Sequence, residues 1–170
     1  MTPIIKVLAA VFVFAAGAAG EQWTAQQLKA RFPYDLGADS VDVSHYPDAQ
    51  QKNYKVFEQT CSKCHTLARP INSPMITQAD WRRYVARMRK KGMLTADKGF
   101  GDEQATAVVD FLAYDSNVRK VQGSAAFKAE SARLKGLFAQ VKAARSKQGI
   151  KDDQQKVKPY GDDTMASPRP

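Results

Sequence analysis

The segment that most constrains this chain is Cys61-Ser62-Lys63-Cys64-His65. Two thiols three positions apart lie about one helical turn apart, so they can reach two vinyl groups on one edge of a porphyrin. The histidine that follows is carried under the ring, where its imidazole can bind the iron. No other cysteine is present. We therefore predict one haem, attached covalently through Cys61 and Cys64 and ligated on its proximal side by His65.

Two other uses of this cysteine pair are a zinc site and a redox dithiol. A structural zinc site needs four ligands, and outside the motif the chain offers only His45 as a further histidine or cysteine ligand. A redox dithiol is expected in a strand–helix–strand unit, whereas the hydrophobic periodicity of this chain indicates helices. Covalent haem attachment is the interpretation that fits the sequence best.

The N-terminal residues predict export. Lys6 precedes an apolar run over residues 7–16, and small residues at 16–20 offer a cleavage site near residues 18–20. Residues 1–20 are therefore interpreted as a signal peptide and the protein as periplasmic. An uncleaved membrane anchor facing the periplasm is the alternative, because residues 3–19 are at the short limit for crossing a bilayer. Export agrees with covalent haem attachment, which in bacteria occurs outside the cytoplasmic membrane.

The rest of the chain divides by composition into four parts. The predicted boundaries are an N-terminal arm at 21–45, a haem domain at 46–121, a basic amphipathic helix at 122–148 and a disordered tail at 149–170. The arm has too few apolar residues for a core of its own and is expected to lie on the haem domain. The basic helix either docks back on the domain or binds a partner or membrane.

Three helices are expected in the haem domain. The first runs from Asp48 into Cys61, with Tyr54 and Phe57 on one face. Residues 66–74 are predicted as loop, because Pro70 and a second proline interrupt them.

The second helix is expected to begin with a capping box at Thr77 and Asp80 and to end at Gly92 as the residue after its C-cap. A loop over residues 93–101 then leads to Asp102, predicted as the cap of a third apolar helix. The apolar face of the second helix holds Trp81, Tyr84, Val85 and Met88.

Charge is unevenly distributed. Residues 61–101 hold nine lysines and arginines against two acids, and residues 122–170 hold ten against five. An exported haem protein is not expected to bind nucleic acid, so the basic surface predicts acidic redox-partner proteins or an anionic membrane surface.

The second axial ligand decides what a haem can do. A thioether closes the iron and favours electron transfer, whereas an open position permits gas or peroxide chemistry. Met88 lies on the apolar face of a capped helix and is the preferred candidate. Met93, in the expected loop, and Met75, separated from His65 by nine residues, are alternatives, and His45 or no ligand is also left open.

Residues 46–115 resemble a bacterial monohaem cytochrome c domain of the class I type. Beyond the haem motif, the residues that carry the resemblance are Val56-Phe57, Thr66-Leu67, Arg69-Pro70, Trp81, Val85, Met88, Val109 and Phe111-Leu112. The resemblance implies that the first and third helices cross, with Phe57 against Phe111 or Leu112. In similar sequences W-x-x-x-V-x-x-M supplies the distal methionine, which here is Met88.

The resemblance also implies two supporting roles. A proline carbonyl, here Pro70, accepts the Nδ1 proton of the haem histidine. Arg69 or an arginine of the second helix pairs with a haem propionate. The function so expected is that of a periplasmic one-electron carrier rather than an enzyme. A fixed haem subunit of a membrane-bound respiratory or photosynthetic complex is the alternative, and a peroxidase or gas sensor with an open distal site is a third.

Overall fold

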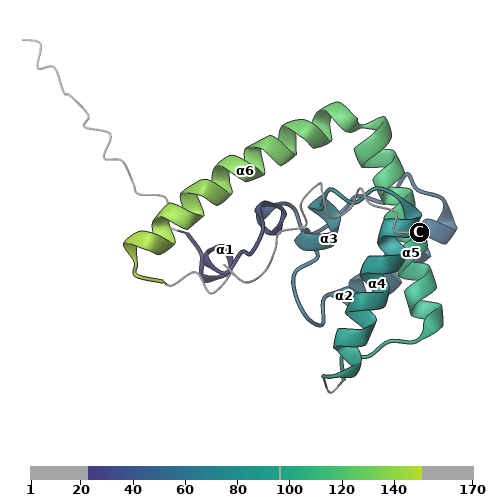
Figure 1. Ribbon diagram of the computed structural model, residues 1–170. Coiled ribbons are helices and arrows are strands. Elements are labelled where there is room, and N and C mark those ends of the chain that lie inside the picture. Colours follow the sequence, from purple (N-terminus) through teal and green to yellow (C-terminus); the bar gives the residue numbers. More distant parts are fainter. Residues whose placement is uncertain (1–22, 96, 151–170) are drawn as a thin grey trace, which may run out of the picture.

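The protein is described by a computed structural model that covers residues 23–95 and 97–150 (Figure 1). Within these residues every regular element is helical, which confirms the expected all-α class. The signal peptide predicted for residues 1–20 and nearly all of the tail predicted for residues 149–170 lie outside the described part. No helix among the described residues has the length and apolar character to span a bilayer.

Three helices form the centre of the fold: α2 (Asp48–Cys61), α4 (Gln78–Met93) and α5 (Asp102–Ser116). Helix α5 contacts both α2 and α4 (Figure 1). The rings of Phe57 and Phe111 are fully buried, and their centroids are 5.1 Å apart. The crossing expected between the first and third helices is therefore confirmed, with Phe57 against Phe111.

The starts of α2 and α4 follow their sequence signals. Helix α2 begins at Asp48 and ends at Cys61, as predicted. At α4 the Asp80 N–H donates to Thr77 Oγ1 at 3.2 Å, and the Thr77 N–H donates to Asp80 Oδ2 at 3.3 Å. This reciprocal pair satisfies two amide donors that the first turn would otherwise leave unpaired, and it confirms the capping box.

The predicted end of α4 and start of α5 were wrong by one or two residues. Gly92 lies inside α4, which continues through Met93. A Cβ atom on Gly92 would lie 2.4 Å from the carbonyl oxygen of Lys98, so the glycine serves the close approach of the returning chain. Asp102 is the first residue of α5, and the cap position belongs to Gly101.

The loop expected over residues 66–74 contains a short helix, α3 (Ala68–Asn72), with Pro70 at its third position. Proline is tolerated there because first-turn amides have no partner within the helix. The Ile71 N–H donates to the carbonyl oxygen of Leu67 at 3.1 Å. The proline therefore lies within a helical turn, and the loop prediction was wrong.

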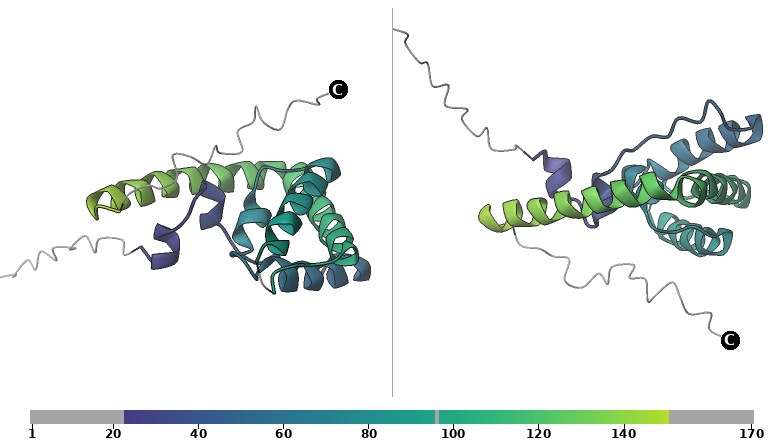
Figure 2. Two further views of the ribbon diagram at one scale, coloured as in Figure 1. Left: turned by 60° about the horizontal axis from the view of Figure 1, so that its bottom comes forward. Right: turned by 90° about the horizontal axis from the view of Figure 1, so that it is seen from above.

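The N-terminal arm lies between α3 and the long helix α6 (Ser124–Lys147), which falls within the range 122–148 predicted for it (Figures 1 and 2). The arm contains α1 (Ala25–Leu28) and the 3₁₀ turn η1 (Pro33–Leu36). The guanidinium of Arg145 on α6 donates to the carbonyl oxygens of Leu28 and Ala30. Helix α6 is thus docked along the arm by its buried face.

One π-helical segment, η2 (Asn117–Gln122), connects α5 to α6. It carries Lys120, which is buried although it is a lysine. Its neighbour Arg119 pairs with Asp115, and Asp115 also accepts a hydrogen bond from the Tyr46 hydroxyl at 3.1 Å. This polar group fixes the junction of the two helices to the core.

Candidate functional site

The two cysteines lie at the end of α2, where the helix gives way to a turn. Cys61 is the last residue of α2 and is partly buried against the hydrophobic core, whereas Cys64 is exposed. Burial raises the pKa of the Cys61 thiol to about 12. Both side chains are free thiols, so both are available for thioether bonds.

His65 presents one ring nitrogen for a metal. Its Nδ1 lies 2.8 Å from the carbonyl oxygen of Thr66. Because a carbonyl oxygen only accepts, Nδ1 carries the proton and the lone pair is left on Nε2. Burial lowers the pKa of His65, the hydrogen bond to Thr66 opposes this shift, and the charges of Arg69 and Lys91 add to it, so the neutral ring is favoured. A neutral imidazole with an oriented Nε2 is the form that binds iron.

The supporting role that the resemblance gives to Pro70 is filled differently in this structure. Thr66, not Pro70, provides the carbonyl oxygen next to His65 Nδ1. The Pro70 carbonyl oxygen instead accepts a hydrogen bond from Ser73 Oγ at 3.1 Å. The reason is the turn of α3, which directs the Pro70 carbonyl along the helix toward Ser73.

One face of α4 carries residues whose charges and burial are linked to the cysteine motif. Tyr84 is buried, and its pKa is raised mainly by burial and to a smaller extent by the charge of Cys61. The charge of Lys91 contributes to lowering the pKa of His65. Tyr84, Met88 and Lys91 follow the spacing i, i+4, i+7 of a single helical face. Met88 shares this face and, like Cys61, is half-buried against the hydrophobic core.

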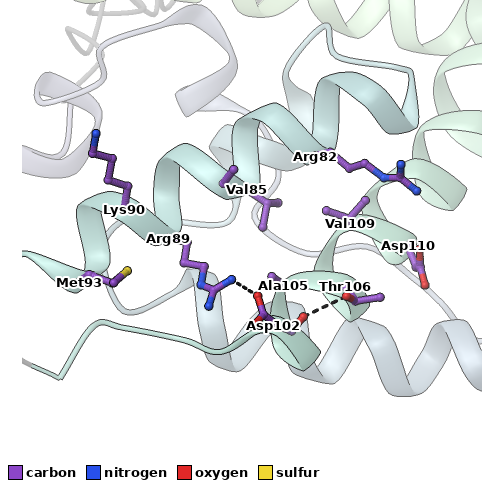
Figure 3. A pocket seen from close by; sticks show the side chains of 11 residues that line it. Arg82, Val85, Arg89, Lys90, Met93, Asp102, Ala105, Thr106, Val109 and Asp110 are labelled. Carbon is purple, nitrogen blue, oxygen red and sulfur yellow. Dashed lines mark hydrogen bonds and ion pairs between the residues drawn. The ribbon is translucent and has the colours of Figure 1, made fainter.

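Met93 lies toward a different helix. Its side chain is 72% exposed and lines a groove of about 620 Å³ between α4 and α5 (Figure 3). Val85, Ala105 and Val109 give this groove apolar walls, and the ion pair of Arg89 with Asp102 joins its two sides. On α4 this groove follows the Val85–Arg89–Met93 line, not the Tyr84–Met88–Lys91 face.

Met75 belongs to the core. Its side chain is 3% exposed and borders a closed void of about 10 Å³ with Tyr34, Arg69 and Tyr84.

His45 is exposed and precedes α2, at the end opposite Cys61. The fourteen residues of α2 span about 20 Å at 1.5 Å per residue, so His45 is too far away to share an iron with His65.

Arg69 is engaged with the arm. Its Nε and Nη2 donate to Asp35 Oδ1 and Oδ2 at 2.7 and 2.8 Å, and its guanidinium lies over the Phe32 ring. On α4 the Arg87 guanidinium lies 5.8 Å from the centre of the Tyr84 ring. Cationic groups of α3 and α4 thus gather beside Tyr84 and His65, as binding of an anionic group such as a propionate would need.

Two residues of this region were not singled out as site residues from the sequence. Tyr84 shares the stripe of Met88, so its spacing was a signal that it would face the motif. No such signal marked Asp35, because it lies 34 positions before Arg69 in a segment without hydrophobic periodicity.

The residues present fit a covalently bound haem. The donor set comprises two thiols, a neutral imidazole and the thioether of Met88. In addition, the buried Tyr84 hydroxyl has no hydrogen-bond partner within residues 23–95 and 97–150, which leaves a polar atom for a bound group to satisfy. The same residues contain no cluster of three or more His, Cys, Asp or Glu that could hold a metal ion by itself.

Comparison with protein-family models, with curated proteins and with solved structures found no match for the chain.

Proposed function

We propose that this protein is an exported one-electron carrier that holds a single c-type haem through Cys61 and Cys64. The observation that supports the proposal is the cysteine–histidine motif at the end of α2, with Cys61 and Met88 packed against the same hydrophobic core. When bound, a haem supplies the one-electron change between ferric and ferrous iron. The chain itself transforms no substrate in this role.

The protein residues have distinct roles in this proposal. The two thiols add to vinyl groups and give thioethers, a step that moves each thiol hydrogen to carbon and needs no oxidant. Thr66 orients His65, and Met88 is the preferred distal ligand. The packing of Tyr84 and Phe57 keeps water from the protein side of the site, which favours a stable, closed coordination.

A basic ridge on α4 is proposed as the docking surface for an acidic redox partner. Arg83, Arg87 and Lys90 are exposed on α4 at the spacing i, i+4, i+7. Such a surface speeds association with an acidic protein, and the effect weakens as salt rises. Changing these three residues to glutamate should slow reduction by the partner and reverse its salt dependence. Unchanged kinetics would contradict the docking role.

The direct test of the function is covalent haem attachment to the full-length chain. Co-expression with a bacterial haem-attachment system should give a protein whose mass exceeds that of the polypeptide by one haem and whose pyridine haemochrome spectrum is that of a c-type haem. C61S/C64S should lose the added mass while keeping its helical content. A wild-type protein with the mass of the bare polypeptide would overturn the proposal.

A second candidate is a haem subunit fixed in a membrane-bound electron-transfer complex. The observation in its favour is α6, which extends beyond the three central helices (Figure 1) and exposes Lys128, Lys135 and Lys142 at intervals of seven residues, on one side. Deleting α6 would also release the arm, so K128E/K135E/K142E is the cleaner variant. A fixed subunit should leave the membrane fraction after this change, whereas a diffusing carrier should be soluble before and after it.

A further inference from the structure

The backbone next to Met75 is held by side chains from the junction of α5 and η2. Lys120 Nζ donates to the carbonyl oxygens of Ser73 and Met75 at 2.9 and 3.0 Å. Ser116 Oγ donates to the Met75 carbonyl oxygen at 3.3 Å. We name these three contacts the Met75 clasp. They fix the chain between α3 and α4, the segment that separates His65 from Met88.

The donors of the clasp are themselves held in place. The Lys120 ammonium lies 4.9 Å from the Trp81 ring centre and 5.5 Å from that of Phe127. The Trp81 indole N–H donates to Ser116 Oγ at 3.0 Å. A buried lysine that supplies two hydrogen bonds to main-chain carbonyls is uncommon, because the charge must be removed from water. Its presence here indicates that the position of the Ser73–Pro74–Met75 backbone is under tight constraint.

Met75 is the methionine that must be kept from reaching the proposed iron site. Its side chain borders the same void as Tyr84 and Arg69, and these two residues interact with Cys61 and His65. A short movement of the 73–75 backbone would therefore bring a second thioether toward the proposed iron site. Met93, by comparison, lies in the groove between α4 and α5.

We propose that the Met75 clasp is a positioning device that keeps the Met75 thioether away from the haem iron, so that Met88 is the sulfur ligand. Lys120 and Ser116 act through the backbone and do not touch the haem. This inference rests on the proposed function, since it needs a haem on Cys61 and Cys64.

The test compares haem-loaded full-length variants by the near-infrared charge-transfer band of ferric iron with a methionine ligand. M88A should lose the band, because Met75 is still clasped. M88A/K120M should regain it, because two of the three clasp bonds are gone and Met75 can move. M88A/K120M/M75L should lose it again. M88A/K128M is the matched control, since Lys128 is an exposed lysine of α6, and it should resemble M88A.

A second measurement does not depend on iron ligation. Amide hydrogen exchange at residues 73–76 should be faster in K120M than in wild type, with exchange in α2 unchanged. If M88A/K120M does not fold, M88A/S116A replaces it, since Ser116 supplies the third bond of the clasp. The inference is overturned if M88A alone keeps a band that M75L removes, or if the folded, haem-loaded double variant shows no band. Absence of covalent haem from the wild type would instead refute the proposed function.

Discussion

Raising the pH from 7 to 9 should stabilise the folded protein, and Lys120 should be the cause. Burial lowers the pKa of Lys120 from 10.5 to about 7, while nearby Asp115 opposes the shift and Arg119 adds to it. In this pH range the unfolded chain keeps its lysine protonated and the folded protein releases the proton. Stability rises with pH wherever the unfolded state binds more protons, so the sign is a gain.

The size of the gain follows from the two pKa values. With 10.5 for the unfolded chain and about 7 for the folded protein, the free energy of unfolding should rise by about 2 kcal/mol between pH 7 and pH 9. Other shifted groups act outside this window. The raised pKa of Tyr84, for example, matters above pH 10. A thioether at Cys61 carries no proton.

The assay is urea unfolding of the haem-loaded protein, followed by circular dichroism at pH 7 and pH 9. K120M should show little change in unfolding free energy between the two pH values. K128M, which alters an exposed lysine of α6, should keep the full gain of the wild type. An equal gain in wild type and K120M would contradict the role of Lys120, because another group would then be the one that titrates.

Four further variants test the packing. G92A should destabilise the protein by about 1–3 kcal/mol, because the new methyl group would meet the Lys98 carbonyl oxygen. G136A, in open space on α6, should instead stabilise it by roughly 0.5–1 kcal/mol. Urea unfolding measures both free energies, and equal effects of the two variants would contradict the role given to Gly92. F57A should cost about 3–5 kcal/mol of stability, seen as a lower melting temperature. R145M should speed amide exchange in the arm while leaving exchange in α2 unchanged, since only the contact of α6 with the arm is lost.

Local signals in the sequence were sufficient for much of the helical framework. The start of α4 was predictable because Thr77 and Asp80 interact within one turn. The end of α4 was not, because Gly92 suggested a helix stop although its role is to admit the Lys98 backbone. The helical turn at Pro70 was missed for a related reason: proline breaks a helix interior but not a first turn.

In the candidate site, too, some residues were predictable from the sequence and others were not. Cys61, Cys64 and His65 are adjacent in sequence and were recognisable from their spacing. Lys120 could not be recognised as buried, because its hydrogen-bond acceptors are 45 to 47 positions away and are backbone atoms, which leave no trace in the sequence. The residues next to a buried polar group in the sequence do not show which distant group will be its hydrogen-bond partner.

The bond from Arg145 to Leu28 joins residues 117 positions apart, which sets an order for folding. The arm is synthesised before the haem motif, yet the surface that receives it includes α6, the last of the described helices. Long-range contacts of this kind form late, since a large loop must close first. The motif at residues 61–65 needs only α2 at its N-terminal side and is complete much earlier. We therefore expect the arm to be seated last, after the residues that would receive the haem have already emerged.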